Sequence, residues 1–208
     1  MREFLIAYHG YGLAFIIGYF LGSIPFGLII TKLAGQGDVR DIGSGSIGAT
    51  NVLRTGSKKL AAATLIADVA KGAIAVSITL YFAATMNFDM FYVYLTAFFA
   101  LTGHMFPVWL KFKGGKGVAT YIGIFLVAAP WAVLVFAITW LSTAYLTRYS
   151  SLAALLACSA TTIYLWLGFT NADWAVPATI LTATVILKHH ENIKRLLNGE
   201  ESKIGDKS

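Results

Sequence analysis

The sequence has 208 residues, of which 57% are hydrophobic and 12% are charged, with a formal net charge of +6 and a mean hydropathy of +0.70. A soluble domain of this length cannot bury so much apolar surface, so the composition excludes a soluble fold and indicates a membrane protein. Several apolar runs approach the roughly 20 residues that cross a hydrocarbon core of about 30 Å. Their short polar gaps predict one membrane-embedded domain over residues 1–208.

Apolar windows and helix breakers predict an all-α bundle of seven transmembrane helices. The predicted helices cover residues 6–33, 58–83, 90–107, 117–129, 131–147, 151–168 and 174–190. The fourth is short for a span, because Gly123 and the turn at Pro130 limit it, and its fusion with the fifth would leave six spans. The first run follows only Arg2 and Glu3 and lacks a small-residue cleavage pattern, so we expect a retained helix.

The basic residues predict the orientation of these helices. All of the 16 lysines and arginines except Arg2 and Lys71 fall on one side when each is assigned to its nearer face. The positive-inside rule therefore predicts a cytoplasmic location for these loops and for the C-terminus, with the N-terminus outside. Topology alone explains most of this charge, so the loop sequences carry more functional information than the basicity does.

The first cytoplasmic loop, DVRDIGSGSIGATNVLRTGSKK, matches the pattern G-x-G-x-x-G at Gly43, Gly45 and Gly48. A dinucleotide-binding fold needs a strand before this pattern, whereas a membrane helix precedes it here, so we reject nucleotide binding. Glycines still let the backbone turn its N–H groups toward one point. Side chains of the same loop add donors and charge: Ser44, Ser46, Thr50, Asn51, Arg40 and Arg54. We predict a phosphate site, with a flexible connector as the alternative.

The second loop, GHMFPVWLKFKGGKGVAT, places Gly114, Gly115, Lys116 and Gly117 directly before a predicted helix. A helix N-terminus offers N–H groups and a partial positive charge, so an anion is favoured there even before Lys113 and Lys116 contribute. The spacing is not that of a Walker A loop, which disfavours nucleotide hydrolysis. The alternative is a basic turn that only anchors the topology.

The third polar segment, KHHENIKRLLNGEE, is predicted to extend the last helix into the cytoplasm. His189 and Asn192 are three residues apart and share a helical face, whereas His190 points elsewhere. An interfacial polar role for His189 and headgroup contacts for the neighbouring basic residues are the alternatives to a catalytic role.

Asp68, Lys71 and His104 are ionisable residues that fall well inside predicted helices. Asp68 and Lys71 are three residues apart, and each would cost about 2.5 to 3.5 kcal/mol if it faced lipid, so we expect both to face the bundle interior and to pair. A structural ion pair is the favoured interpretation, and contact of Lys71 with a substrate anion is the alternative. We expect His104 to be a polar packing residue, and the single cysteine, Cys158, to pack without a disulfide.

Together these segments resemble the bacterial membrane-bound glycerol-3-phosphate acyltransferases of the PlsY type, which use acyl phosphate as the donor. The similarity runs through LGSIPFG, RDIGSGSIGATNVLR, ADVAKG, GHMFPVWLKFKGGKGVAT, RYSSL and KHHENIKRLLNGEE. It implies seven helices, a cytoplasmic active site, and acyl transfer from acyl phosphate to the 1-hydroxyl of sn-glycerol 3-phosphate, which yields lysophosphatidate and phosphate. It also implies the bacterial inner membrane, the first acylation of phospholipid biosynthesis, and an enzyme producing acyl phosphate as a functional partner.

The resemblance assigns catalytic roles to Ser44, Lys116, His189 and Asn192. The expected substrate-binding residues are Arg54, Gly43, Gly45, Ser46, Asn51, Gly114, Gly115, Gly117, Lys113 and Ser151. The family commonly has Asn at the position of Ser46, so a donor persists there, but the resemblance does not predict its geometry. We expect the glycerol hydroxyl to attack the acyl carbonyl directly, and we expect no cofactor and no metal. His189 or the phosphate of the substrate is the candidate base, and a covalent acyl intermediate on Ser44 is the less favoured route.

Three other functions compete with this prediction. A transporter of organic anions would use the loops for binding, but the sequence has no clear internal hydropathy repeat, and its polar motifs gather on one face. An acyltransferase that uses acyl-CoA is the closer competitor, although no histidine is followed five residues later by aspartate. A metal-dependent phosphatidyl transferase would need clustered carboxylates, which the cytoplasmic loops lack. Nucleic acid is not an expected partner.

Overall fold

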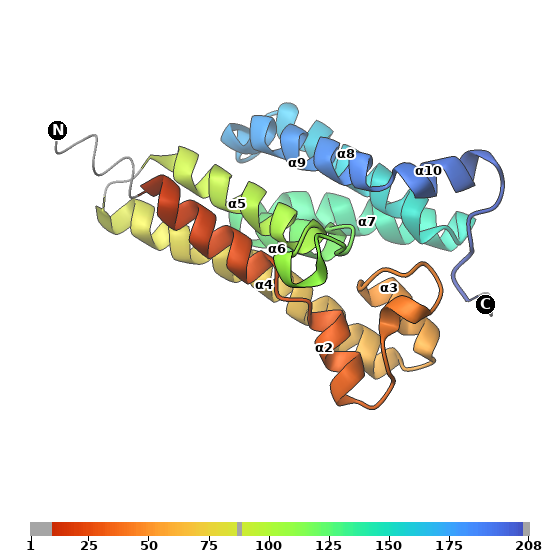
Figure 1. The fold of residues 1–208 in the computed structure, drawn as a ribbon. Coiled ribbons are helices and arrows are strands. Elements are labelled where there is room, and N and C mark those ends of the chain that lie inside the picture. Colours follow the sequence, from red (N-terminus) through yellow and green to blue (C-terminus); the bar gives the residue numbers. More distant parts are fainter. Residues whose placement is uncertain (1–9, 87–88, 206–208) are drawn as a thin grey trace. The chain divides into compact units, whose positions relative to one another are not determined.

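The computed structural model describes residues 10–86 and 89–205, and every regular element in these ranges is a helix (Figure 1). The predicted all-α class is therefore confirmed. The chain forms two compact units, residues 1–127 and residues 128–208. A single domain over the whole chain stays a prediction.

The first unit contains the elements that carry both Gly-rich loops. In chain order they are the helix Gly10–Phe20 with its π-helical segment Ile16–Phe20, α2 (Phe26–Leu33), the 3₁₀ turn Val39–Asp41, α3 (Ala49–Val52), the 3₁₀ turn Leu53–Thr55, α4 (Lys58–Met86), α5 (Met90–Met105), the 3₁₀ turn Val108–Leu110 and α6 (Val118–Ala128). α5 packs against the first helix and against α4, and α4 also packs against α2 and α3.

The predicted continuous helix over 6–33 is wrong, because the helix is interrupted at residues 23–25. Proline lacks an N–H group and disfavours a helical conformation at the residue before it, so the helix ends ahead of Pro25 and α2 begins after it. Residues 6–9 of that prediction lie outside the described residues. The break matters for the site, because α2 leads directly into the first Gly-rich loop.

The second unit contains four α-helices in its described residues. They are α7 (Pro130–Thr147), α8 (Ser150–Trp166), α9 (Ala175–Lys188) and α10 (His190–Leu197), with a 3₁₀ turn at Ala172–Trp174. α8 packs against α7 and α9. α6 and α7 are separate helices, because Ala129 between them is not helical, with φ −153° and ψ 75°, and Pro130 starts α7. The last helix is not continuous through residue 190 as predicted, since His189 separates α9 from α10.

Helix lengths within the described residues bear on the number of spans. Three helices are long and apolar enough to cross a membrane: Lys58–Met86, Met90–Leu110 and Pro130–Thr147. Gly10–Phe20, Val118–Ala128 and Ser150–Trp166 are shorter apolar helices. The 11 residues of α6 rise only about 16 Å, which is about half of a hydrocarbon core. Seven spans and the orientation of the termini stay predictions.

Close contact between helices in the first unit depends on glycine. A Cβ at Gly22 would overlap the Ala100 carbonyl of α5, and one at Gly103 would overlap the Tyr19 carbonyl. Small residues that let helix backbones approach are typical of packing in membranes, where burial of apolar side chains gives little driving force. These contacts hold α5, and therefore the start of the second loop, against the first helix.

Candidate active site

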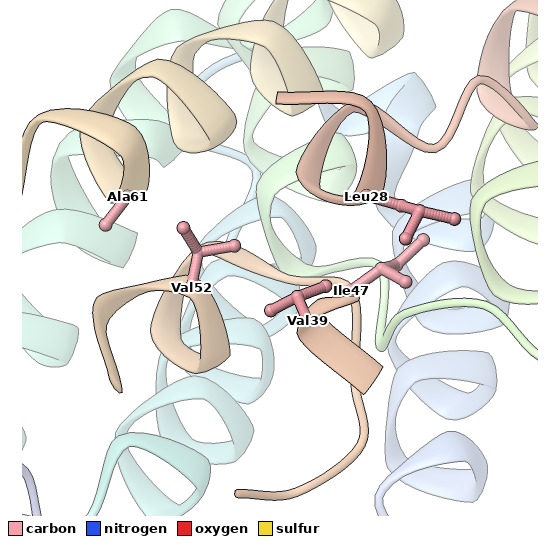
Figure 2. Packing of buried hydrophobic residues seen from close by; sticks show 5 residues of the cluster. All are labelled: Leu28, Val39, Ile47, Val52 and Ala61. Atoms are coloured by element: carbon pink, nitrogen blue, oxygen red, sulfur yellow. The ribbon is translucent and has the colours of Figure 1, made fainter. Parts of the chain in front are cut away.

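The first Gly-rich loop is a folded element with its own apolar core. Val39, Ile47 and Val52 are buried, and they pack with Leu28 of α2 and Ala61 of α4 (Figure 2). Burying such side chains contributes about 1.5 to 3 kcal/mol for each of the larger ones. The loop therefore has a fixed shape, and it is not a flexible connector.

Asn51 holds this loop together from inside. Its amide nitrogen donates to the carbonyl oxygens of Val39 (2.8 Å), Ile42 (3.1 Å) and Ser46 (2.8 Å), and its oxygen accepts from the backbone N–H of Ser44 at 3.0 Å. The Ser44 hydroxyl lies 3.3 Å from the same oxygen. Because both ends of this buried amide bind loop groups, Asn51 organises the loop, and its direct contact with substrate stays a prediction.

One corner of the loop brings a hydroxyl group and a guanidinium group together. Gly43 has a φ of +53° and lies under the half-buried Arg54, so that any Cβ at Gly43 would overlap the Arg54 side chain. Ser44 follows at once and is exposed. A guanidinium and neutral donors on a fixed backbone suit a phosphate group, since charge-assisted hydrogen bonds to phosphate are strong and directional. Gly45 also has a positive φ, and the Ser46 hydroxyl accepts from the Gly48 N–H.

The second loop is fastened to the end of α5. The N–H of Gly114 donates to the Met105 carbonyl, and the N–H of Gly115 donates to the His104 carbonyl, both at 3.1 Å. These two N–H groups therefore already have acceptors within the protein. Contact of Gly114 and Gly115 with substrate stays a prediction, and it would have to use other atoms.

Lys116 lies between this fastened segment and a helix N-terminus. It is half-buried, and Gly117, with a φ of +83°, turns the chain into α6. The backbone N–H groups in the first turn of a helix favour an anion, and Lys116 is a basic residue two positions before this turn. Lys113 is exposed on the same loop. A phosphate site at this end of α6 stays a prediction.

The two loops of the first unit are joined to each other. Leu110 of the second loop packs against the apolar core of the first loop. The Trp109 indole N–H donates to the Ser23 carbonyl at 2.7 Å, which ties the second loop to the turn before α2. The supports of the two loops therefore touch, although the two motifs are far apart in sequence. A shared site of Ser44, Arg54 and Lys116 stays a prediction.

In the second unit, His189 occupies the junction between α9 and α10 and is 1% exposed. Its Nδ1 lies 2.8 Å from the Val185 carbonyl. A carbonyl oxygen can only accept, so Nδ1 carries the hydrogen, and in the neutral ring Nε2 is the nitrogen that can take up a proton. The neighbouring His190 is exposed, and its Nδ1 lies 3.0 Å from the Leu187 carbonyl. The two histidines therefore differ in environment as predicted.

Glu201 gathers three side chains of the second unit. Its Oε1 accepts from the Ser151 hydroxyl at 2.6 Å and from the Asn192 amide at 2.7 Å, and its Oε2 accepts from the Arg195 Nε at 2.7 Å. Ser151 and Asn192, both predicted site residues, therefore meet through this carboxylate. We did not predict a role for Glu201, because nothing in the sequence distinguishes it from Glu200.

The electrostatics of Glu201 follow from this arrangement. Burial opposes ionisation of the carboxyl, but hydrogen bonds from Ser151, Asn192 and Arg195 outweigh it, so the pKa of Glu201 is lowered from its ordinary value. We expect Glu201→Gln to destabilise the protein by about 2 kcal/mol at neutral pH, because hydrogen bonds to a charged group are lost. Thermal unfolding in detergent measures this, and Glu200→Gln, which changes the exposed neighbour, is the control.

The same experiment has a pH dependence with a defined sign. Because the pKa of Glu201 is lower in the folded chain than the ordinary 4.5, its carboxylate stabilises the fold above that pH. This stabilisation is lost as the pH falls below about 4.5 and through the folded-state pKa. The Tm of the wild type should therefore fall more steeply on acidification than that of Glu201→Gln. If the Tm of the wild type and that of Glu201→Gln fell in parallel with pH, the Glu201 carboxylate would not contribute to stability.

A comparison with known proteins identifies the family. The sequence profile described as "Glycerol-3-phosphate acyltransferase" matches residues 12–199. The chain belongs to the glycerol-3-phosphate acyltransferase family. Glycerol-3-phosphate acyltransferases from Agrobacterium fabrum and Brucella anthropi are 56% and 57% identical to it, over 94% and 93% of this chain and 92% and 93% of theirs.

A solved member of the glycerol-3-phosphate acyltransferase family has the same fold. The crystal structure of PlsY (YgiH), an integral membrane glycerol 3-phosphate acyltransferase, in its glycerol 3-phosphate form matches with a TM-score of 0.85 and 36% identity, over 94% of this chain and 96% of that one. Its lysophosphatidic acid form matches with a TM-score of 0.83. These matches confirm the family resemblance, an acyltransferase of phospholipid synthesis, and a multi-pass membrane protein.

Membership in the glycerol-3-phosphate acyltransferase family favours the enzyme over the transporter considered above. It does not test the individual site residues, whose roles stay predictions. Within residues 10–86 and 89–205, no group of three or more His, Cys, Asp or Glu side chains is placed to hold a metal ion. Independence of metal is likewise a prediction.

Proposed function

We propose that the protein transfers a fatty acyl group from acyl phosphate to the 1-hydroxyl of sn-glycerol 3-phosphate, releasing lysophosphatidate and phosphate. The observation that carries this proposal is the pair of folded cationic loops that touch in the first unit, because both substrates carry a phosphate group. The related PlsY is described in a glycerol 3-phosphate form and in a lysophosphatidic acid form, which match the proposed acceptor and product.

The proposed reaction is a direct attack on an activated acyl group. The hydroxyl oxygen of the acceptor forms a bond to the acyl carbonyl carbon, and the bond from that carbon to the phosphate oxygen breaks. Lys116 and the first N–H groups of α6 stabilise negative charge on the carbonyl oxygen and on the departing phosphate. Arg54 and Ser44 hold the acceptor phosphate. Positioning of this kind supplies much of the rate when the leaving group is already good.

The hydroxyl proton must leave during this attack. Nε2 of His189 is the proposed acceptor, because Nδ1 is committed to the Val185 carbonyl. Asn192 orients the acceptor in this proposal, and Ser151 and Glu201 position the Asn192 amide. A phosphate oxygen of the substrate is the alternative base. Trapping of an acylated Ser44 in the absence of acceptor would contradict direct attack.

The proposal includes a topology and a cellular location. We infer seven spans, an outside N-terminus, a cytoplasmic C-terminus and residence in the bacterial inner membrane as a single domain. The support is the strong bias of basic residues toward one face and the apolar helices. An enzyme that produces acyl phosphate is the proposed functional partner, and no cofactor takes part.

Donor specificity tests the proposal. Purified protein in detergent or lipid mesophase is given labelled glycerol 3-phosphate with either palmitoyl phosphate or palmitoyl-CoA, with and without EDTA. We expect lysophosphatidate from palmitoyl phosphate only, at a rate that EDTA does not change. Product from palmitoyl-CoA alone would show that the donor is acyl-CoA and not acyl phosphate. Loss of activity with EDTA that magnesium restores would contradict a metal-independent mechanism.

A further inference from the structure

A cluster of three ionisable side chains lies buried between α4 and α5. Asp68, Lys71 and His104 are each at most 3% exposed. The Lys71 ammonium lies 2.8 Å from Asp68 Oδ1, and His104 Nδ1 lies 3.6 Å from the same oxygen. The sequence predicted the Asp68–Lys71 pair but treated His104 as a separate packing residue. The structure joins all three.

His104 connects this cluster to the second loop. Its backbone carbonyl accepts from the N–H of Gly115, and its Nε2 lies directly against Gly115, where any added Cβ would overlap the ring. Gly114 packs against the same carbonyl. The next residue is Lys116. A change in the ring orientation of His104 would therefore displace the backbone that carries Lys116.

Lys71 connects the cluster to the support of the first loop. Its ammonium donates to the Ile24 carbonyl at 2.9 Å, in the turn that precedes α2. In α2, Gly27 lies against the Ile47 carbonyl of the first loop, so closely that a Cβ there would overlap it. The Trp109 indole N–H from the second loop binds the adjacent Ser23 carbonyl. The cluster thus touches the supports of both loops.

Stability alone gives no reason for such a cluster. A buried ion pair loses solvation of both charges, and well-packed apolar residues of similar volume are often as stabilising or more so. Unlike apolar packing, the polar interactions of Asp68 are directional. They fix the positions of Lys71 and His104, which an apolar core would leave free to repack. Those two neighbours are the ones that contact the loop supports.

We propose that Asp68, Lys71 and His104 form a positioning cluster, which sets the two Gly-rich loops at the separation that the reaction needs. The inference rests on the proposed function, because the loops are taken to hold the two phosphate-bearing substrates. The three residues act through the backbone at Gly115 and Ile24 and do not touch substrate. A misplacement of about 1 Å at a reacting group costs about 100-fold in rate.

The double variant Asp68→Leu with Lys71→Met tests this role, since it replaces the ion pair with apolar side chains of similar size. We expect the Tm in detergent to stay at or above that of the wild type, while kcat/KM falls by about 100-fold and the KM for glycerol 3-phosphate rises. His104→Phe, which keeps a ring but loses both nitrogens, should show the same kinetic pattern.

Thr79→Val is the matched control. Thr79 is also a buried polar residue of α4, and its hydroxyl bonds with the Ala75 carbonyl of α4 at 3.2 Å and with the Thr96 hydroxyl of α5 at 3.0 Å. Neither of these partners is a loop support. We expect its kcat/KM to equal that of the wild type. Equal loss in this variant would overturn the inference, because any buried polar change in α4 would then have the same effect.

Limited trypsin cleavage after Lys113 and Lys116 gives a readout that does not need activity. We expect faster cleavage in the double variant than in the wild type or in Thr79→Val, because the second loop loses its fixed position. Unchanged kcat/KM and unchanged cleavage would overturn the positioning role. An inactive but folded wild type would instead overturn the proposed function, and the cleavage rates would still decide the inference.

Discussion

Lys116→Ala is expected to lower kcat/KM for acyl transfer by about 10³-fold, with little change in thermal stability. The side chain stands at the N-terminus of α6, where charge on the carbonyl oxygen and the departing phosphate is stabilised in the proposed mechanism. Loss of one donor to such charge costs about 10² to 10³ in kcat, and weaker binding of phosphate adds to it. Initial rates at varied palmitoyl phosphate and varied glycerol 3-phosphate separate the two contributions.

Lys111→Asn is the control for Lys116→Ala. It removes a positive charge from the same loop at an exposed position outside the proposed site, and asparagine readily adopts the left-handed backbone that Lys111 has, with a φ of +51°. We expect nearly unchanged kinetics. If both variants lost activity equally, general attraction of anions to the basic face would explain the effect, and the specific role of Lys116 would be wrong.

His189→Asn should lower kcat by about 10² to 10⁴, the range for loss of a general base. Asparagine cannot take up the hydroxyl proton, although it is small enough for the junction between α9 and α10. The rate of the wild type should fall on acidification as Nε2 becomes protonated, and this dependence should disappear in the variant. The measurement is kcat against pH at saturating concentrations of both substrates.

His190→Asn isolates this effect, because the neighbouring ring has a similar backbone contact but is exposed to solvent. We expect a rate and a pH profile close to those of the wild type. Near-normal turnover of His189→Asn with an unchanged pH profile would rule out the base role and would leave a phosphate oxygen of the substrate as the proton acceptor.

Much of the helical framework could be predicted from hydropathy alone. The predicted segment 131–147 agrees with α7 within one residue, and 90–107 begins where α5 begins. These boundaries follow from proline, glycine and charged residues, which act locally. The break at Pro25 was missed because the apolar run continues through it, and hydropathy does not register the missing N–H group.

The supports of the candidate site were much harder to predict. Asn51 was predicted to bind substrate, but the sequence did not indicate that its amide also binds four residues of its own loop. Glu201 lies 50 residues from Ser151, and no periodicity links the two. His104 looked like packing because its partners come from α4 and from the second loop. Motifs indicate which residues bear chemistry, whereas the contacts that orient those residues depend on the tertiary fold.

The segment after α10 has a consequence for how far the chain tolerates shortening. The Ile204 N–H donates to the Arg148 carbonyl at 2.7 Å, and the Arg148 guanidinium donates to the Ile204 carbonyl. Glu201 of the same segment accepts from Ser151, at the start of α8, and from Asn192 of α10. Trimming by a carboxypeptidase as far as Gly199 would remove Glu201, the carboxylate that Ser151 and Asn192 both bind. The segment after α10 is therefore needed to hold these two side chains in place.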